Sequence, residues 1–500
     1  MIRGGIYIFL PHSATYHNIL IMDYPLIGRE KERAILTKAM QSGEAELIAI
    51  VGRRRIGKTF LVRKVYAEEI DVEVSGIQNL STKEQIQNFK LQLKNSMQQD
   101  YIARKTTNWL DTFQLMIECL EKKNKVGRMV VFIDELPWLS APKSGFLNGL
   151  SFFWNSWASK KNIIVVICGS AASWMIQKVV QDKGGLHNRI TKRIDLQPFN
   201  LYETELFFKS RNINLDRYHI VQIYMALGGV PHYLKEVEGG LGAAQNIDQI
   251  LFSKKAILRD EFDRLYPALF DQAENHIAVV RALAKKRHGM TRQEILKWTN
   301  LADGGGTTRI LDELEISGFI SIYYPFGKKK KDTFYRLTDE FSLFYIQFME
   351  NKGNKGEGIW QQLSQTQDYK SWSGYTFESI CMKHVNQIKK ALGILGVYTE
   401  ASGFIAKDSD FGKGIQIDLV LDRRDHIINL FEIKFYNTVW ALDKEEAEKL
   451  KHKKDVFKLL TKTQKQVFLT LISTFGLNPN IHSVGLIDNT LTMNNLFEPD

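Results

Sequence analysis

Residues 46–69 read ELIAIVGRRRIGKTFLVRKVYAEE: an apolar run, a glycine-rich turn and an amphipathic stretch in immediate succession. The turn contains the pattern G-x-x-x-x-G-K-T at Gly52, Gly57, Lys58 and Thr59. When a strand precedes such a turn and a helix follows it, backbone N–H groups at the helix start can surround phosphates. The segment therefore predicts a P-loop in an α/β domain, with Lys58 on the β and γ phosphates of ATP and Thr59 on Mg²⁺.

Phosphoryl transfer also needs a carboxylate for the metal ion and a group that positions water. Residues 128–140, RMVVFIDELPWLS, supply both after a second apolar strand. We expect Asp134 to hold the Mg²⁺ shell and Glu135 to orient or deprotonate the attacking water. The alternative is a strand that simply ends in two solvated acids. Three arginines inside the P-loop (Arg53, Arg54 and Arg55) are unusual there, and the simplest expectation is that solvent surrounds them.

A third apolar strand, in NIIVVICGSAASWM (162–175), places Ser170 at its carboxyl end. Ligands of open α/β sheets bind at that edge. Ser170 is therefore either a sensor of the γ-phosphate or a cap of the next helix. Downstream, Arg189 is a candidate for a charge-stabilising arginine, with an ordinary surface arginine as the alternative.

The remaining chain divides by composition into further units. Residues 23–199 contain the P-loop motifs, and 200–265 have amphipathic helical spacing that Gly228, Gly229 and Pro231 interrupt. Residues 266–350 predict three helices and then a lysine-rich hairpin, the order of a winged helix-turn-helix. Residues 351–360 are rich in glycine and charge and predict a linker, and 361–500 have the length of one further domain.

Whether the winged-helix unit binds DNA is open from its residues. Lys328 to Lys331 at the hairpin tip could contact phosphates. The third helix carries acidic side chains, so only Thr307, Thr308 and Arg309 at its start could reach bases. A packing or protein-contact unit explains the pattern equally well.

A second group of chemically active side chains lies in QIDLVLDRRDHIINLFEIKF, residues 416–435. As a hairpin centred on Asp425, this segment places Asp418 opposite Glu432, and Lys434 on the same face. Glu378, in an upstream helix, could add a third carboxylate. Two carboxylates facing each other favour a divalent cation such as Mg²⁺, which activates water and stabilises charge on a phosphodiester. The alternative is a structural cluster in which Lys434 neutralises both acids.

Composition limits the class of protein. The 500-residue chain carries a net charge of +11 and a pI near 9.2, which favours an anionic partner such as DNA. Three distant cysteines fit a reducing cytosol, and no apolar run has the length of a membrane-spanning helix. Residues 1–22 make a poor signal peptide, and we expect them to be disordered or not part of the natural protein, with Met22 as the start.

Five segments together resemble the archaeal-type ATPases of the AAA+/STAND group: PLIGREKE, GRRRIGKT, VFIDELPWL, CGSAASWM and GGVPHYL. The resemblance extends over nearly the whole chain from Asp23. It implies that Arg29 and Glu30 lie at the adenine edge of the nucleotide. The pattern FES…QIDLVLDR…FEIKF is similar to the PD-(D/E)xK nuclease superfamily. That similarity implies a restriction-endonuclease-like α/β domain, with Glu378, Asp418, Glu432 and Lys434 as its site.

The sequence therefore predicts a cytoplasmic P-loop ATPase with a parallel sheet and a helical lid. A winged-helix unit and a nuclease-like domain would follow, and ATP, ADP and DNA would be the partners. Two alternatives remain. One is a STAND-type signalling switch with an inactive C-terminal domain, and the other is a winged-helix DNA-binding regulator. Either a ring or an assembly formed on activation would make the protein a homo-oligomer.

Overall fold

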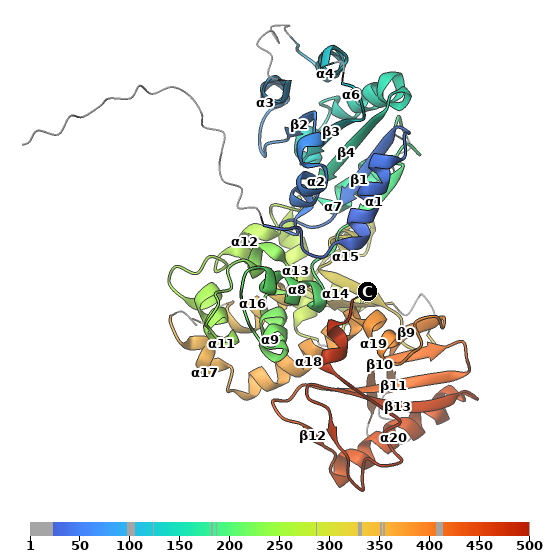
Figure 1. The fold of residues 1–500 in the computed structure, drawn as a ribbon. Coiled ribbons are helices and arrows are strands. Elements are labelled where there is room, and N and C mark those ends of the chain that lie inside the picture. Colours follow the sequence, from blue (N-terminus) through green and yellow to red (C-terminus); the bar gives the residue numbers. More distant parts are fainter. Residues whose placement is uncertain are drawn as a thin grey trace, which may run out of the picture.

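The computed structural model describes residues 24–97, 106–123, 125–181, 184–186, 188–286, 288–328, 333–350, 353, 356–406 and 414–499. The expected extension 1–22 and the lysines 329–331 of the predicted hairpin tip lie outside these residues. Figure 1 shows one sheet at one end of the molecule, helices in the middle and a second sheet at the other end. Within the described part, no helix is long and apolar enough to cross a membrane.

The first sheet has five parallel strands in the order β2-β3-β4-β1-β5. Every residue of β1 and β4 is buried, as a parallel sheet with helices on both faces requires. The predicted α/β fold with a parallel sheet is therefore confirmed. The strands are β1 (Glu46–Val51), β2 (Val72–Ser75), β3 (Met129–Asp134), β4 (Ile163–Gly169) and β5 (Lys192–Asp195).

Two sets of helices cover this sheet. Because side chains alternate along a strand, Ile48 and Ile50 of β1 join one core, with α1 and α2. Leu47 and Ala49 join the core on the other face. The helices are α1 (Glu30–Gln41) and α2 (Lys58–Tyr66) on the first face, and α3 (Thr82–Met97), α4 (Trp109–Lys123) and α6 (Phe146–Phe152) on the second.

The helices expected in 200–265 are present, and they form a layer beside the carboxyl edge of the sheet (Figure 1). A Cβ at Gly229 would lie 1.8 Å from the carbonyl oxygen of Phe199, so only glycine allows this backbone approach. The predicted helix break follows from that contact. The helices are α8 (Leu201–Ser210), α9 (Arg217–Leu227), α10 (Pro231–Leu234), α11 (Ala243–Ile247) and α12 (Glu261–Leu265).

The next unit has the predicted order of three helices and a hairpin. Thr291 caps the second helix through a capping box with Glu294, as its position in the sequence suggests. A two-residue strand that the sequence did not reveal, β6 (Met290–Thr291), pairs with the second hairpin strand. The elements are α13 (Ala273–Ala284), α14 (Arg292–Thr299), α15 (Gly305–Ile316), β7 (Ile320–Tyr323) and β8 (Phe334–Leu337), and α16 (Glu340–Phe348) follows them.

The start of α15 differs from the expectation that its side chains could reach DNA bases. Thr307 is only 3% exposed, and its hydroxyl donates to the carbonyl oxygen of Ala302 at 2.7 Å. Thr308 accepts a hydrogen bond from Arg292 at 3.1 Å. The prediction is therefore wrong for Thr307, because this side chain closes its own helix terminus, whereas Thr308 and Arg309 are exposed.

The C-terminal sheet has five strands in the order β15-β13-β11-β10-β9. Strand β10 is antiparallel to both of its neighbours, β9 and β11. Strand β13 is parallel to both of its neighbours, β11 and β15. Helices α18 (Gln367–Lys383) and α20 (Lys444–Thr461) pack on it. The strands are β9 (Thr399–Ala406), β10 (Ile415–Arg423), β11 (Ile427–Lys434), β13 (Gln466–Ser473) and β15 (Asn489–Thr492).

The hairpin of β10 and β11 has the register expected from the sequence. Leu419 pairs with Phe431 and Leu421 with Asn429, so the strands turn about Asp425. Asp418 and Glu432 are the next residues outward from the first pair. A bulge against β9 between Ile417 and Val420 lies at the same point of β10.

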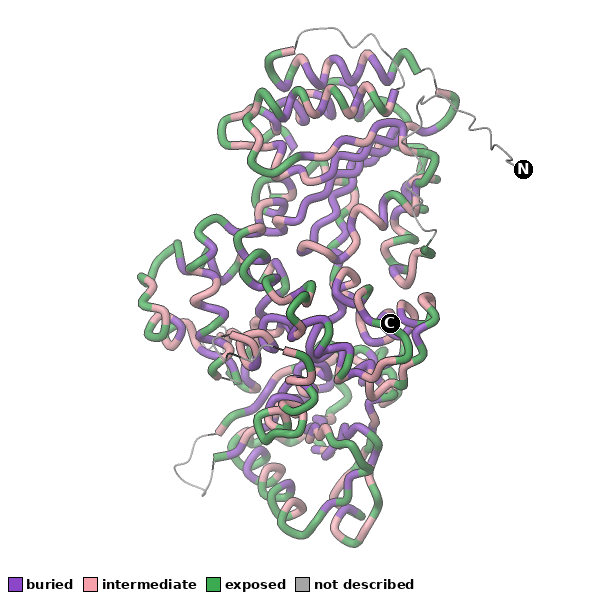
Figure 2. Tube along the Cα trace, turned by 90° about the vertical axis from the view of Figure 1, so that its left-hand side faces the viewer, coloured by how far each residue is buried: buried purple, intermediate pink, exposed green. Residues whose placement is uncertain are grey.

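One apolar core joins the helical units to the C-terminal sheet. Trp360, the last residue of the expected linker, is 2% exposed and stacks on Phe252 at 5.9 Å. It is the second residue of the short helix α17 (Ile359–Leu363) and also contacts Phe344. Figure 2 shows buried residues through the middle of the molecule, where these segments meet. The predicted linker therefore does not separate two independent cores.

This shared core leads to a stability prediction. Replacing Trp360 by alanine removes a fully buried ring, which should cost about 3–5 kcal/mol of unfolding free energy. Because the core is shared, hydrogen exchange in urea should show α11 and β11 of this variant opening together, at lower urea concentrations than in the parental protein. Trp298→Ala is the matched control. Its side chain is 55% exposed, and its loss should cost less than about 1 kcal/mol. Earlier opening of α11 alone would contradict a shared core.

Candidate functional site

The P-loop is held in a closed conformation by its own lysine. Lys58 donates to the carbonyl oxygens of Gly52 and Arg53 at 2.9 and 2.8 Å. A Cβ at Gly52 would lie 2.5 Å from the carbonyl oxygen of Leu196, so the loop requires glycine at this point. Burial lowers the pKa of the Lys58 ammonium group. A phosphate could therefore compete with these carbonyl oxygens for a lysine that is already oriented.

The two predicted magnesium ligands of this loop are in direct contact. The Thr59 hydroxyl donates to one carboxylate oxygen of Asp134 at 2.6 Å. The other oxygen accepts from the Glu135 N–H at 2.8 Å and from the thiol of Cys168. A hydroxyl and a carboxylate side by side, next to the P-loop lysine, fit a magnesium ion bound together with phosphates.

Glu135 lies at the carboxyl end of β3 with a left-handed backbone (φ 46°). Its carboxylate accepts from the Ser170 hydroxyl at 2.9 Å and from the Ser170 N–H at 3.3 Å. Burial raises the pKa of Glu135, while Lys58 opposes the shift. Ser170 thus contacts the candidate catalytic carboxylate. It is not the cap of the next helix, α7 (Ala172–Met175), whose N-cap is Ala171 with no side-chain hydrogen bond.

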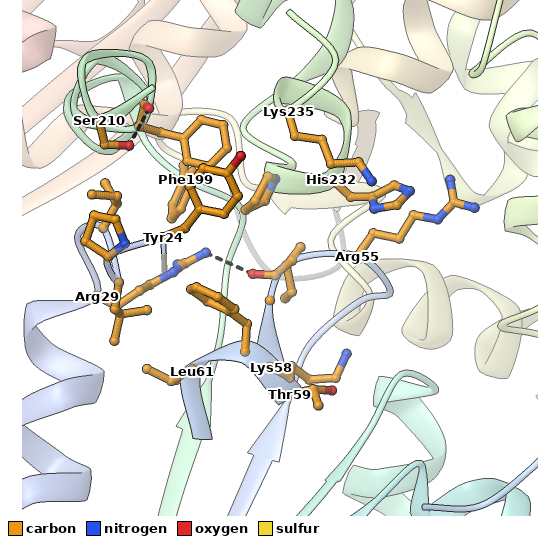
Figure 3. A pocket seen from close by; sticks show the side chains of 18 of the residues that line it. Tyr24, Arg29, Arg55, Lys58, Thr59, Leu61, Phe199, Ser210, His232 and Lys235 are labelled. Atoms are coloured by element: carbon orange, nitrogen blue, oxygen red, sulfur yellow. Dashed lines mark hydrogen bonds between the residues drawn. The ribbon is translucent and has the colours of Figure 1, made fainter. Parts of the chain in front are cut away.

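These groups open into a cavity of about 440 Å³ (Figure 3). Lys58, Thr59 and Glu135 lie at one end of it, and apolar, aromatic and basic side chains line the remainder. The wall includes side chains from the N-terminal segment, from the P-loop helix and from the helical layer. They are Tyr24, Pro25, Leu26, Ile27, Arg29, Phe60, Leu61, Phe199, Phe207, Arg211, Pro231, His232 and Lys235.

Arg29, which the family resemblance places near the adenine, lies in this wall. Its guanidinium group stacks over the Phe199 ring at 4.5 Å and donates to the carbonyl oxygen of Ile56 at 3.3 Å (Figure 3). Its side chain therefore joins the P-loop to the aromatic end of the cavity. Arg189 is different, because it is exposed and does not line the cavity. The structure thus does not bring Arg189 to this site.

Two basic residues of the wall were not expected from the sequence. His232 and Lys235 come from the α10 segment and point toward Arg55 in Figure 3. Burial and the neighbouring cations lower the pKa of His232 to about 4, so it is neutral at pH 7. The helix break at Gly228 was visible in the sequence. Its position over the cavity depends on a fold-back of the chain that local patterns do not encode.

Two of the three P-loop arginines, Arg53 and Arg55, are engaged with distant segments, which corrects the expectation of solvated charges for these two. Arg53 forms a buried ion pair with Asp339 and lies over the Phe319 ring at 4.7 Å. Arg55 pairs with Glu261 of α12, a residue that is only 4% exposed. The phosphate-binding loop is therefore tied directly to the helical layer and to the start of α16.

The second predicted cluster lies at one end of the β10–β11 hairpin. The Glu432 carboxylate contacts the Lys434 ammonium group at 2.9 Å and that of Lys453, from α20, at 2.7 Å. Burial opposes ionisation of Glu432, but these two lysines hold its pKa below the usual value. Burial and the nearby charge of Asp418 raise the pKa of Glu378 to about 8. The predicted residues thus lie close enough to interact electrostatically.

These acids do not form the expected three-carboxylate metal site in this structure. Among the residues that the structure describes, no three His, Cys, Asp or Glu side chains are arranged to hold a metal ion. The physical reason is that the lysines already neutralise Glu432. Lys453 is the member that the sequence did not reveal, because its helix carries many lysines and their spacing does not show which one faces the sheet.

Comparison with known proteins identifies the first of the two sites. Residues 26–237 match a family model described as an ATPase domain predominantly from Archaea. The matched segment is similar to archaeal-type P-loop ATPase domains and covers less than half of the chain. The match ends after α10, so it includes the P-loop, the acids after β3 and the α10 wall of the cavity. The match supports ATP binding and hydrolysis by this part of the chain.

Similar proteins extend beyond that segment. An uncharacterized protein of Methanocaldococcus jannaschii is 25% identical over 368 residues, which cover 73% of this chain and 78% of that protein. A Walker-type ATPase of Pyrococcus abyssi is 16% identical, with 64% and 96% of the two chains covered and a TM-score of 0.48. The ORC2 protein of Aeropyrum pernix is 15% identical, with 67% and 94% covered and a TM-score of 0.40.

The contact between Ser170 and Glu135 gives a kinetic prediction. Ser170→Ala removes a hydrogen bond to the carboxylate, and such bonds are worth about 1.5–3 kcal/mol. We expect kcat for ATP hydrolysis to fall roughly tenfold or more, while ADP affinity stays within about twofold. Ser210→Ala, which removes a hydroxyl at the apolar end of the same cavity, serves as the control. An unchanged kcat in Ser170→Ala would mean that Ser170 does not hold Glu135 during turnover.

Proposed function

We propose that this protein is an ATP-driven switch whose nucleotide state controls a C-terminal, metal-dependent, DNA-directed nuclease-like domain. The observation that carries this proposal is that two arginines of the P-loop form ion pairs with distant segments of the chain. Arg53 pairs with Asp339, directly after the β7–β8 hairpin, and Arg55 pairs with Glu261 in the helical layer. A change of loop conformation on phosphate binding therefore acts on segments that pack against the C-terminal sheet.

For ATP hydrolysis, we assign the role of each residue from the contacts that it makes. The phosphates of ATP would take Lys58 from the carbonyl oxygens of Gly52 and Arg53, and the glycines would let backbone N–H groups surround them. Thr59 and Asp134 would hold Mg²⁺, which neutralises charge on the phosphate oxygens. Glu135, held by Ser170, would orient the attacking water and accept its proton.

Two substitutions separate binding from hydrolysis. Lys58→Ala should abolish nucleotide binding or turnover, because the cation that faces the phosphates is lost. Glu135→Gln should bind ATP normally and lose hydrolysis, because Asp134 and Thr59 remain. Fluorescent-nucleotide binding and phosphate release measure the two properties. If Glu135→Gln hydrolysed ATP at the parental rate, the assignment of Glu135 as the water-orienting residue would be wrong.

For the C-terminal domain, we propose that Asp418, Glu432 and Glu378 bind Mg²⁺ and that Lys434 stabilises charge on a phosphodiester. The support is their common position at the end of the hairpin and the electrostatic effect of Asp418 on Glu378. For the ion to bind, Glu432 would exchange a lysine contact for the metal. When bound, the ion would lower the pKa of a water molecule and polarise the phosphodiester.

DNA is the partner that the net charge of +11 favours. We assign DNA contact to the C-terminal domain rather than to α15. Thr307 is buried and Thr308 is held by Arg292, and α15 itself packs against α7 of the ATPase. These contacts favour the reading of the winged-helix unit as a protein-contact element and count against the alternative of a DNA-binding regulator.

A second candidate function is a STAND-type switch with an inactive C-terminal domain. The observation that favours it is the neutralisation of Glu432 by both Lys434 and Lys453, which suits a structural cluster. This reading predicts nucleotide-dependent homo-oligomers and no cleavage. Identical size-exclusion profiles with ADP and with a nonhydrolysable ATP analogue would count against it.

The cleavage assay decides between the two readings. Purified protein with Mg²⁺ or Mn²⁺ should cut duplex, branched or single-stranded DNA in an ATP-dependent manner. Asp418→Ala and Glu432→Ala should each lower the rate by about a hundredfold or more, since each would remove a metal ligand. Asp422→Asn is the matched control, because Asp422 is another acid of β10, paired with Lys465 and outside the site. Equal signals from the parental protein and Asp418→Ala on every substrate would rule out the nuclease.

A further inference from the structure

We infer that the β7–β8 hairpin holds the C-terminal acidic site closed, with the Arg336 guanidinium group standing where a divalent cation would bind. We further infer that the Arg53–Asp339 ion pair links this contact to the nucleotide site. The inference rests on the proposed function of the acidic site and adds its regulation. Arg336 belongs to β8, whereas the acids it faces belong to α18 and β10.

The first observation is the position of Arg336 on α18. Its Nε donates to the Tyr375 hydroxyl at 3.1 Å, and its Nη1 lies 2.9 Å from the sulfur of Met382. Residues 375, 378 and 382 follow the spacing of one helix face. The guanidinium group therefore spans the face that carries Glu378. Although burial lowers the pKa of Arg336, Tyr375 and the acids Glu378 and Asp418 raise it above its usual value.

The second observation is that the same unit also contacts the strand that carries Asp418. The Gln416 amide lies 2.5 Å from both the His288 ring and the Asp418 carboxylate. The Tyr323 hydroxyl donates to the His288 carbonyl oxygen, which fixes this edge of the hairpin. Asp418 is thus contacted through Gln416 from the winged-helix side. The acidic site is covered from two directions by one unit.

The third observation concerns the described part of the hairpin near its tip. The Phe326 N–H donates to the Gly403 carbonyl oxygen of β9 at 2.7 Å. The Phe326 ring packs on Phe457 of α20 at 5.1 Å. The hairpin therefore contacts the C-terminal domain at two places, one at the acidic site and one beyond it. Arg336 cannot leave the acidic site unless the Phe326 contact also moves.

The fourth observation is the clamp at the base of the hairpin. Phe319 precedes β7 and Asp339 follows β8, and the N–H of Asp339 donates to the Phe319 carbonyl oxygen at 3.1 Å. Arg53 contacts both residues, through the ring of Phe319 and the carboxylate of Asp339. The carbonyl oxygen of Arg53 is also a resting partner of Lys58. Phosphates that take Lys58 would therefore disturb the residue that clamps the hairpin base.

Two residues separate Asp339 from Arg336, so the path from the P-loop to the acidic site is short. With the clamp intact, the positive charge of Arg336 stays on the face of α18 that carries Glu378 and opposes the approach of a metal ion. When ATP changes the P-loop, the clamp loosens, Arg336 withdraws, and Glu378 and Asp418 become available to a divalent cation. By thermodynamic reciprocity, a metal ion bound at the acids should also change nucleotide affinity.

The first test measures metal binding by the full-length protein. Arg336→Met removes the charge and keeps most of the side-chain volume. Isothermal titration with Mn²⁺ should show roughly tenfold tighter binding than in the parental protein, because a competing cation is gone. Adding Asp418→Asn should abolish that gain. Arg281→Met, at an exposed arginine of the same unit paired with Glu350, should leave the affinity unchanged.

Parental Mn²⁺ affinity in a folded Arg336→Met variant would overturn the inference. If that variant fails to fold, Phe326→Ala replaces it, because it weakens the hairpin anchor without touching the buried charge. Faster hydrogen exchange in β8 together with tighter Mn²⁺ binding supports the inference. Faster exchange with unchanged Mn²⁺ affinity overturns it.

The second test addresses the link to the nucleotide. In the parental protein, a nonhydrolysable ATP analogue should raise hydrogen exchange in β7 and β8 relative to ADP. Asp339→Asn keeps a residue that can cap α16 and removes the charge that Arg53 holds. This variant should show the faster exchange with either nucleotide. If the ATP analogue raised hydrogen exchange in β7 and β8 of this variant as much as in the parental protein, the inferred link between the nucleotide site and the hairpin would be overturned.

Metal binding and DNA cleavage report separately on the inference and on the proposed function. If Arg336→Met binds Mn²⁺ more tightly and no DNA is cleaved, the closed-site inference is supported and the proposed nuclease activity is overturned. If the parental protein cleaves DNA and Arg336→Met changes neither the Mn²⁺ affinity nor the cleavage rate, the proposed nuclease is supported and the closed-site inference is overturned.

Discussion

The buried ion pair between Arg53 and Asp339 is the contact on which the arrangement of this molecule depends. Both side chains are less than 5% exposed, and the pair joins the phosphate-binding loop to the turn before α16. Two other guanidinium nitrogens of Arg53, Nε and Nη2, have no hydrogen-bond partner among the residues that the structure describes. Removing one partner of such a pair typically costs about 3–5 kcal/mol, since the remaining charge stays buried.

The shared core explains why that contact can influence a distant site. Apolar residues of the helical layer, of the unit of three helices and a hairpin, and of the C-terminal sheet form one cluster. Tyr218 of α9 stacks on Phe435 at 5.4 Å, just after β11. Close-packed interiors change between discrete arrangements rather than deforming gradually. A displacement at the P-loop would therefore reach the acidic site through packed elements and not through a loose tether.

The sequence predicted the local chemistry well and the long-range contacts poorly. The P-loop and the acids after β3 follow from rules that act within a few residues, as does the hairpin register about Asp425. By contrast, Arg53 and Asp339 lie 286 positions apart in the sequence. The burial of Trp360 was hidden by its glycine-rich neighbours. Composition predicted a linker there, but one aromatic ring was enough to place the segment in a core.

Both sites share a feature that no motif describes: their cations rest on internal acceptors. Lys58 is held by two carbonyl oxygens of its own loop, and Lys434 and Lys453 are held by Glu432. Arg336 lies against the face of α18 that carries Glu378. In each case an incoming phosphate or metal ion would exchange one partner for another rather than create a new charge. Because taking a charge out of water is costly, these internal contacts allow the cations to lie in partly buried positions before any ligand binds.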